Sequence, residues 1–176
     1  MTPRIPPLPP EERDPRVEEL LAPLRRPGGG DLNIFATLAH HPKLLKRWSA
    51  FGGTLLYGGT LDARDRELLI LRTAHNCDAH YEWHQHVAIA KAAGVTDDEI
   101  ERVPAGLDSD QWTAADRALL AAADELHDSA KISDPTWEQL SSRYDAQQLI
   151  EICMVVGQYH LVAFTLNSLG VEVEEP

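Results

Sequence analysis

Apolar residues recur along this chain at the three- and four-residue spacing of amphipathic helices, and helix-ending residues separate the periodic stretches. The apolar positions between residues 17 and 24 predict a first helix within residues 16–26, which the sequence PGGGD ends. Residues 33–58 predict two further helices, the second beginning near Pro42, because proline is favoured in the first turn of a helix.

Capping residues predict the boundaries of the helices that follow. Asp62 precedes an apolar run and predicts the start of a helix. Gly94 predicts the end of the next helix, because glycine is the usual residue just beyond a helix C-terminus. Thr96 and Glu99 have the three-residue spacing of a capping box, which predicts another helix start.

A second series of helices is predicted in the C-terminal half of the chain. Thr113 and Thr136 each precede a helical pattern, and Asp145 opens a long helix that runs to Leu169. No stretch shows the polar–apolar alternation and hairpin turns typical of β-strands. The sequence therefore predicts an all-α protein with seven to nine helices.

Two segments resemble each other and favour an internal duplication. AHYEWHQHVAIAKAAGV and VGQYHLVAFTLNSLGV both end in Gly-Val. Each carries an aromatic–histidine pair, Trp83–His84 or Tyr159–His160, at the same distance from that end. A duplicated helical hairpin is one interpretation of this pair, and two unrelated helices are the other.

The composition and the proline content predict one domain with an N-terminal extension. Five prolines among residues 2–10 predict an extended arm over residues 1–13, followed by a helical domain over residues 14–176. Apolar residues make up 43% of the 176 residues, which is enough for a sizeable core and excludes global disorder.

The charge and hydropathy patterns exclude several classes of partner. The chain has 16 basic and 28 acidic residues, and a formal net charge of −12 repels a phosphate backbone, so nucleic acid is not expected as a partner. The N-terminus has no apolar signal region. The most apolar stretch, residues 150–169, is interrupted by Gln158, His160 and Asn167, so no membrane span is expected. These features predict a soluble cytoplasmic protein.

Titratable residues are concentrated in the stretch NCDAHYEWHQH, residues 76–86. On a helix, Glu82 and His86 lie four residues apart on one face, where a carboxylate can hold the orientation and tautomer of an imidazole. His80 and His84 form a second pair, rotated by about 160° from the first at about 100° per residue. One pair should therefore face the interior and the other should face solvent or a neighbouring subunit.

The residues alone leave several interpretations open. Glu82 and His86 form either an acid/base pair or a surface pair, and His80 and His84 form either a solvated face or a metal site. Cys77 is either a reactive thiol near a helix start or a buried structural one. The spacing of Cys77 and Cys153 fits no zinc signature, and no metal is expected.

The combined stretch DRELLILRTAHNCDAHYEWHQHVAIAKAAGVTDDEI resembles the carboxymuconolactone decarboxylase family, which includes the alkylhydroperoxidase D-like proteins. The resemblance is strongest over residues 60–103. In the peroxidase branch, a glutamate precedes a Cys-x-x-Cys-x-x-x-His motif on the next helix. Placing the motif histidine on His86 puts the glutamate on Glu67, which matches. The two cysteine positions fall on Ala79 and Glu82, which do not match.

The resemblance implies an oligomeric, alkylhydroperoxidase D-like helical bundle. Because the cysteine pair is missing, it also implies the decarboxylase-type branch, a carboxy-lyase that transfers protons on a small lactone or keto acid without a cofactor. By this resemblance, His86 would be the proton donor or base. Glu82 would be its orienting or proton-sharing partner, and Glu67 would be a relay residue. Tyr81 and Trp83 are expected to shape the substrate pocket.

Two alternative functions remain at this point. The first is an alkylhydroperoxidase-like peroxidase, an antioxidant enzyme that would use Cys77 as its redox thiol. The second is a non-catalytic helical oligomer or small-molecule binding protein. The family resemblance further implies a homo-oligomer, a trimer or hexamer, with a small-molecule substrate and neither nucleic acid nor membrane as a partner.

Overall fold

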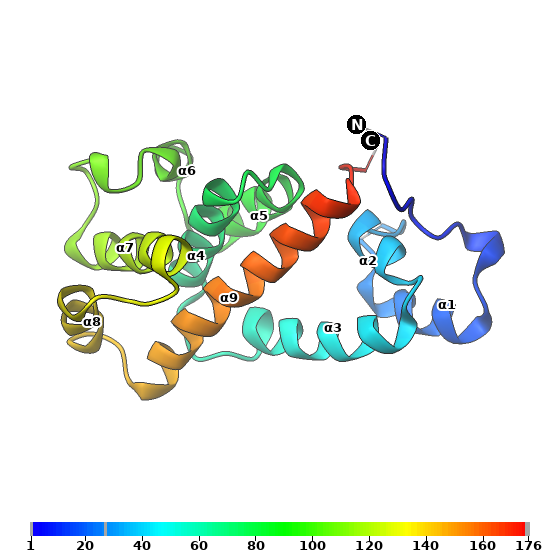
Figure 1. Ribbon diagram of the computed structural model, residues 1–176, viewed down its shortest axis with the longest axis horizontal. Helices are drawn as coiled ribbons and strands as arrows, with labels where there is room; N and C mark the ends of the chain where they lie inside the picture. Colours follow the sequence, from blue (N-terminus) through cyan, green and yellow to red (C-terminus); the bar gives the residue numbers. More distant parts are fainter. Residues whose placement is uncertain (1, 27, 175–176) are drawn as a thin grey trace. The chain divides into compact units, whose positions relative to one another are not determined.

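The computed structural model describes residues 2–26 and 28–174, and these residues form nine α-helices and no β-strand (Figure 1). The predicted all-α class and the predicted number of helices are confirmed. Four residues lie outside the described residues. They are Met1 in the predicted arm, Pro27 in the predicted helix stop PGGGD, and Glu175 and Pro176 at the C-terminus. The α-helices are α1 (Pro15–Leu21), α2 (Asn33–Leu38), α3 (Pro42–Tyr57), α4 (Ala63–Asn76), α5 (His80–Ala92), α6 (Asp97–Arg102), α7 (Ala114–Ser129), α8 (Asp134–Ser141) and α9 (Ala146–Leu169). Three short 3₁₀ segments, η1 (Pro10–Glu12), η2 (Ala22–Leu24) and η3 (Val103–Asp108), join them.

Most helix boundaries follow from the capping residues named above. The Asp62 carboxylate accepts a hydrogen bond from the backbone N–H of Arg64 at 2.9 Å and so caps α4. Thr96 and Glu99 form a complete capping box at the start of α6. Gly94 follows α5 with a φ of +94°, a conformation in which a residue with a Cβ atom is strained.

The predicted start of α8 is wrong. Thr136 does not precede the helix but lies inside it, because α8 begins at Asp134 after Ser133. The cause is a tertiary contact with α7, since the Glu125 carboxylate accepts hydrogen bonds from the Ser133 backbone N–H at 2.6 Å and from the Thr136 hydroxyl at 2.7 Å. Pro135 in the first turn suits this earlier start.

The chain divides into two compact units, which are described separately. The first unit comprises the described residues of Met1–Thr54 and Thr165–Pro176. Its core contains Val17, Leu21, Ala39 and Leu45. The proline-rich arm contains no α-helix in residues 2–13, and its backbone is anchored within the unit by hydrogen bonds from Arg4 to the Leu169 carbonyl at 2.8 Å and from Leu8 to the Ala36 carbonyl at 3.0 Å.

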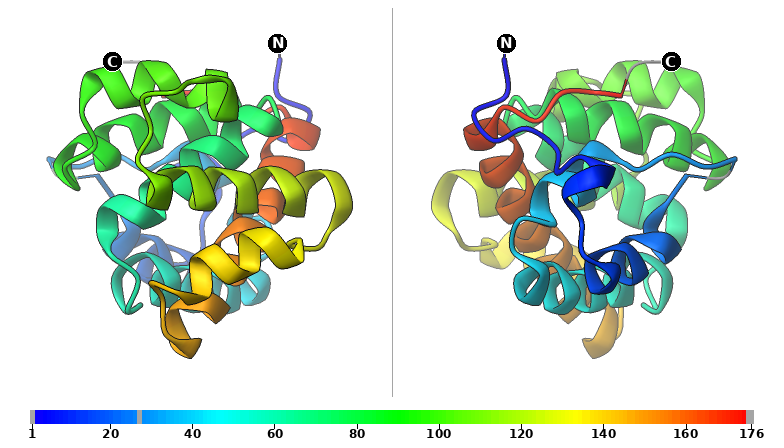
Figure 2. Two further views of the ribbon diagram at one scale, coloured as in Figure 1. Left: turned by 90° about the vertical axis from the view of Figure 1, so that its left-hand side faces the viewer. Right: turned by 90° about the vertical axis from the view of Figure 1, so that its right-hand side faces the viewer.

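The second unit, Leu55–Phe164, is built around α4. Four consecutive side chains of α4, Leu68 to Leu71, are fully buried, so neighbouring elements cover this helix on every side. One core cluster joins α4 to α7, α8 and α9, and a second joins it to α5, α6, η3 and α7. The pair α7 and α8 packs together and faces the viewer in the left view of Figure 2. This enclosure makes α4 the scaffold on which polar side chains can be held inside the unit.

The helix α9 is long and apolar enough to cross a membrane when only length and composition are considered. Half of its most apolar window is buried inside the structure, and one such helix is weak evidence for a membrane span. Its buried residues Ile152, Val156 and Tyr159 belong to the core that contains α4, which is the role of a core helix.

A network around Arg72 fixes the irregular segment η3 to α4 and α7. The Arg72 guanidinium pairs with the Asp124 carboxylate at 2.6 and 3.0 Å and donates to the Val103 carbonyl at 2.9 Å. Gly106 adopts a φ of +51°, and a Cβ atom at that position would fall on the Arg72 guanidinium. Glycine is therefore required here for two reasons, backbone conformation and space.

We predict that Gly106→Ala destabilises the protein by roughly 3–5 kcal/mol, because it adds backbone strain and displaces a partly buried ion pair. The control is Gly94→Ala, which also has a positive φ, +94°, but nothing within 4 Å of the added Cβ atom. This control should cost about 1–2 kcal/mol. Urea unfolding measures both variants, and equal losses of stability would contradict the steric role of Arg72.

Candidate functional site

A histidine and a glutamate from neighbouring helices form the first element of the candidate site. His86 on α5 and Glu67 on α4 are joined by a 2.7 Å hydrogen bond between Nδ1 and Oε2. Glu67 is fully buried and His86 is 7% exposed. Because a carboxylate only accepts hydrogen bonds, Nδ1 of the ring carries the proton in this contact. The arrangement fixes the ring and leaves Nε2 as the nitrogen available for chemistry.

The second oxygen of Glu67 also has a partner. Arg66 Nε donates to Glu67 Oε1 at 3.1 Å, so the carboxylate lies between a guanidinium and an imidazole. Such pairing is what allows a carboxylate to be buried without a large energetic cost. Sequence reasoning did not identify Arg66, whose only signal is its position next to Glu67.

The prediction that Glu82 orients His86 is wrong. Glu82 is buried on α5, but neither of its carboxylate oxygens has a hydrogen-bond partner among the described residues. The physical reason is that Glu67 reaches the ring from α4 and occupies Nδ1, so the predicted relay residue is the partner of His86. The structure does place Glu67, Glu82 and His86 together in the interior of the second unit, and their catalytic roles stay a prediction.

Burial without a partner changes the chemistry of Glu82. Desolvation penalises the charged carboxylate and raises the pKa of Glu82 well above its ordinary value of 4.5. The neutral acid, which can donate a proton, is therefore favoured. Buried polar groups normally have partners, so an unpartnered buried carboxyl is typical of a site that receives a ligand.

Tyr159 on α9 completes the buried group. Its ring meets the His86 ring edge-on, with ring centroids 4.9 Å apart and an interplanar angle of 90°. Burial, followed by the charges of Glu67 and Glu82, raises the pKa of Tyr159 well above the usual value for a phenol. The hydroxyl therefore stays protonated and can donate a hydrogen bond. In the sequence, the only signal for Tyr159 is the repeated aromatic–histidine pair.

The remaining predicted residues of the stretch divide between the interior and the surface. Tyr81 is buried, and the partly buried Trp83 packs against the core that includes Leu68. Their expected role in shaping a substrate pocket stays a prediction. His80 and His84 are exposed, in agreement with the expectation that the two histidine pairs face opposite ways.

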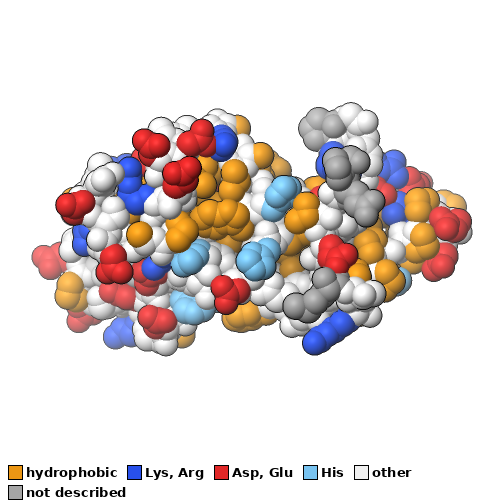
Figure 3. All heavy atoms as spheres, turned by 90° about the horizontal axis from the view of Figure 1, so that it is seen from above, with side chains coloured by type: hydrophobic (Ala, Val, Ile, Leu, Met, Phe, Trp, Pro, Cys, Tyr) orange, Lys and Arg blue, Asp and Glu red, His pale blue; other side chains and the backbone are white. Residues whose placement is uncertain are grey.

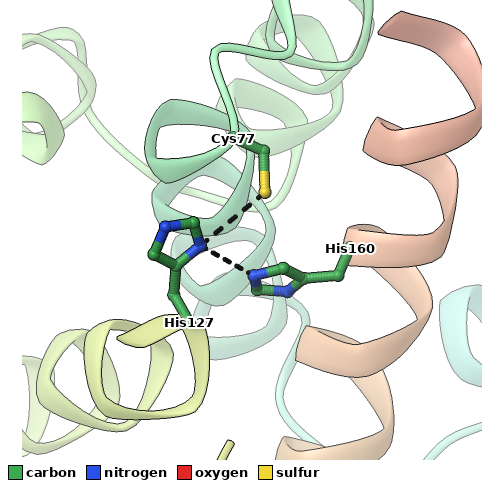
Figure 4. Close-up of side chains that lie close together, drawn as sticks. All are labelled: Cys77, His127 and His160. Carbon is green, nitrogen blue, oxygen red and sulfur yellow. Dashed lines mark hydrogen bonds between the residues drawn. The ribbon is translucent and has the colours of Figure 1, made fainter. Parts of the chain in front are cut away.

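Cys77 lies at the C-terminal end of α4 beside two histidines that are distant in sequence (Figure 4). Its Sγ is 3.9 Å from His127 Nδ1, and that nitrogen is 2.9 Å from His160 Nε2. Neither histidine was identified as a site residue from the sequence, and the pair Tyr159–His160 was the only signal. The two thiols, Cys77 and Cys153, form no disulfide with each other.

The environment of Cys77 does not favour a reactive thiolate. Burial, followed by the negative charges of Glu82 and Asp78, raises the pKa of Cys77 to about 11. Catalytic cysteines generally have a lowered pKa, because the thiolate is the nucleophile. This argues against the peroxidase alternative that would use Cys77.

Comparison with known families identifies the segment that contains this site. Residues 42–125 match the model of the Carboxymuconolactone decarboxylase family. The predicted family resemblance is confirmed. The matched residues include Glu67, Glu82 and His86, whereas Tyr159 and His160 lie beyond the matched segment. A comparison with curated proteins gave no match.

Solved structures confirm the alkylhydroperoxidase D-like fold. One similar structure is a protein from Ralstonia eutropha JMP134, described as an alkylhydroperoxidase AhpD core and an uncharacterized peroxidase-related protein. It is 18% identical to this chain, and the two structures superpose with a TM-score of 0.83. The alignment covers 97% of this chain and 93% of the Ralstonia chain. An uncharacterized peroxidase-related protein from Silicibacter sp. TM1040 is 16% identical, with a TM-score of 0.82. That alignment covers 99% of this chain and 95% of the Silicibacter chain. A third similar structure is the debrominase Bmp8, in a cysteine-to-alanine variant complexed with 2,3,4-tribromopyrrole. It is 17% identical, with a TM-score of 0.80, and the alignment covers 97% of this chain and 91% of the debrominase chain. At these identities the likeness shows the fold alone.

We predict that Glu82→Gln stabilises the protein at neutral pH, by an amount that increases with pH. The unfolded carboxyl ionises near its ordinary pKa of 4.5, whereas the folded pKa is raised. The wild type therefore has its full stability below that pH and loses stability as the pH rises toward the folded pKa, by at most about 1.4 kcal/mol per pH unit. Glutamine resembles the neutral acid and does not ionise, so the variant lacks this loss.

Denaturant unfolding of wild type and Glu82→Gln across the acid to neutral range measures the difference in stability. A difference that is constant with pH would show that Glu82 is not desolvated in the folded protein.

Proposed function

We propose that this protein is a cofactor-free acid/base enzyme that decarboxylates, or transfers a proton on, a small lactone or keto acid. The observation that carries the proposal is a buried, unpartnered carboxyl, Glu82, one helical turn before a histidine that a second buried glutamate orients. Two acids in such different environments are suited to different steps of one proton-transfer reaction. The family matched by residues 42–125 supports the choice of a carboxy-lyase.

The proposed reaction assigns one task to each buried group. In a decarboxylation, the bond between the substrate carbon and its carboxylate breaks, CO₂ leaves, and the electron pair remains as an enolate. The enolate then takes a proton at carbon, from the neutral Glu82 carboxyl or from His86, and solvent restores that proton. The Tyr159 phenol can donate a hydrogen bond to the developing enolate oxygen.

Glu67 is a positioning residue in this proposal. It holds Nδ1 of His86 at 2.7 Å, so the ring is ordered before the substrate binds. Preorganised groups lower the barrier because they do not have to reorient during the reaction. The buried surroundings of Glu67, Glu82 and His86 keep these interactions in a low-dielectric medium, which strengthens them.

Thiol chemistry is the less supported alternative. A peroxidase of this fold needs a reactive thiolate and a second thiol to resolve it. The raised pKa of Cys77 opposes the need for a reactive thiolate. Cys77 and Cys153 pack against different clusters of the core, which does not support a resolving role for Cys153.

The debrominase complex with 2,3,4-tribromopyrrole is consistent with a small ring-shaped substrate in this fold.

We predict that His86→Asn lowers turnover by roughly 10²–10⁴-fold, the usual contribution of a general acid or base. Glu82→Gln should cause a comparable loss, because an amide keeps the shape of the neutral acid but does not give up a proton. The measurement is turnover of a panel of lactones and β-keto acids in D₂O, with deuterium at the product carbon as the readout.

The control variant is His84→Asn, which changes an exposed histidine on the same helix. It should leave turnover and deuterium incorporation unchanged. Equal losses for His84→Asn and His86→Asn would contradict the assignment, as would turnover that survives in both His86→Asn and Glu82→Gln. Circular dichroism of all three variants separates a loss of chemistry from a loss of folding.

We further propose a homo-oligomer, a trimer or hexamer, that works in the cytoplasm on a small molecule without nucleic acid or membrane partners. Large apolar side chains on α9, namely Ile150, Met154 and Phe164, are 63%, 43% and 61% exposed, and their spacing puts them on one face of the helix. Apolar side chains grouped in this way are typical of an interface between subunits. Acidic side chains are spread over the face shown in Figure 3, which agrees with the net charge of −12 and opposes binding to nucleic acid.

We predict that Phe164→Asp lowers the mass of the particle in solution, because a buried charge opposes association at that face. Light scattering at micromolar concentration measures the mass of both proteins. A wild type that is monomeric under these conditions, or a variant of unchanged mass, would contradict an interface at this face of α9.

A further inference from the structure

Three side chains with metal-binding atoms converge from three helices of the second unit. Cys77 ends α4, His127 lies near the end of α7, and His160 lies in α9 (Figure 4). Their ligand atoms, one from each residue, all lie within 4.8 Å of one another. No pair of these residues is closer than 33 positions in sequence, so their meeting is a property of the fold.

The distances among these atoms are near those that a tetrahedral zinc ion requires. Zinc–nitrogen bonds of about 2.0–2.1 Å and zinc–sulfur bonds of about 2.3 Å place tetrahedral ligands about 3.3–3.6 Å apart. The observed separations are 3.9 Å between Cys77 Sγ and His127 Nδ1 and 2.9 Å between His127 Nδ1 and His160 Nε2. Since all three ligand atoms lie within 4.8 Å of one another, their separations bracket the tetrahedral values.

A hydrogen bond prepares His160 as a ligand. Its Nδ1 lies 2.8 Å from the carbonyl oxygen of Val156, one turn earlier on α9. A carbonyl only accepts, so Nδ1 carries the proton, and Nε2 of the neutral ring has its lone pair toward His127. Metal-binding histidines commonly donate their other N–H to a backbone carbonyl in this way, which fixes both ring orientation and tautomer.

The ligand types and the local charge favour a zinc-type ion. One thiolate and two imidazoles suit zinc and copper, whereas magnesium and calcium prefer oxygen ligands. Asp78 directly follows Cys77 in the sequence, and a carboxylate next to the thiol favours a bound cation. His127 is exposed, so solvent reaches the cluster at this side chain, which also lines an open cavity of about 320 Å³ with Asp124 and Asp128.

We propose that Cys77, His127 and His160 bind one Zn²⁺ ion, with a fourth position open to water or a small ligand. Binding forms one zinc–sulfur and two zinc–nitrogen bonds and releases the Cys77 thiol proton to solvent. The proton on Nδ1 of His127 moves to Nε2 of the same ring, so one proton is released for each ion bound. Three protein ligands with an open position are the arrangement of reactive zinc sites.

This site is separate from the acid/base group. None of its three ligands is Glu67, Glu82 or His86, so the metal proposal does not depend on the proposed reaction. It also differs from the histidine pair that the sequence suggested for a metal, because His80 and His84 are exposed on α5 and belong to no metal-binding group found in residues 2–26 and 28–174.

The test is a titration of the chelator-treated full-length chain with Co²⁺, a coloured substitute for zinc. We expect one equivalent to bind, with a thiolate-to-cobalt charge-transfer band, the visible bands of tetrahedral cobalt, and displacement of cobalt by Zn²⁺. Cys77→Ser should abolish the charge-transfer band. His160→Asn removes a direct ligand, so it should lower the affinity for cobalt by at least roughly 10–100-fold. Loss of a residue that only supports a ligand already has an effect of that size.

Two matched variants control for the other cysteine and for surface histidines. Cys153→Ser and His84→Asn should both bind cobalt as the wild type does. His127→Asn changes an exposed side chain, so it keeps the test decisive if Cys77→Ser proves to be misfolded by circular dichroism.

Three results would overturn the proposal. They are a wild type that shows no charge-transfer band, full binding that persists in His127→Asn and His160→Asn, or binding that is lost in His84→Asn. A copper complex that forms while zinc fails to displace cobalt would overturn the assignment to zinc.

Discussion

The second unit depends on how one fully buried carboxylate is accommodated. Glu67 lies inside a helix whose next four side chains are also fully buried, so water cannot solvate its charge. The carboxylate is stabilised by His86 from α5 on one oxygen and by Arg66 on the other. This contact ties α5 to α4 at a defined register, and the position of His86 in the interior follows from it.

The contrast between Glu67 and Glu82 gives the site its chemical character. Both acids are buried, but Glu67 has two partners and Glu82 has none among the described residues. A desolvated acid without a partner favours the proton, which is why the pKa of Glu82 is raised. Similar side chains in different surroundings can therefore supply an oriented base and a neutral acid within one small volume.

The long helix α9 connects the buried acid/base group with the sulfur–imidazole cluster. Tyr159 meets His86, and the next residue, His160, meets His127 beside Cys77. Consecutive residues on a helix point about 100° apart, so one turn of α9 serves two neighbouring groups.

The sequence by itself determined the all-α class, most helix boundaries and the opposite orientation of the two histidine-containing pairs on α5. These features depend on local properties, namely apolar periodicity, side-chain caps such as Asp62 and Thr96, and the fixed angle between residues four apart on a helix. The family resemblance further pointed to Glu67 and His86 as members of one site.

The tertiary structure decided which of these residues touch. It made Glu67 rather than Glu82 the partner of His86. It moved the start of α8 to Asp134 through the contact with Glu125. It also brought His127 and His160 close to Cys77. Each of these outcomes depends on the packing of different helices against one another. Periodicity along a single helix states which way a side chain faces, but not which group from another helix lies opposite it.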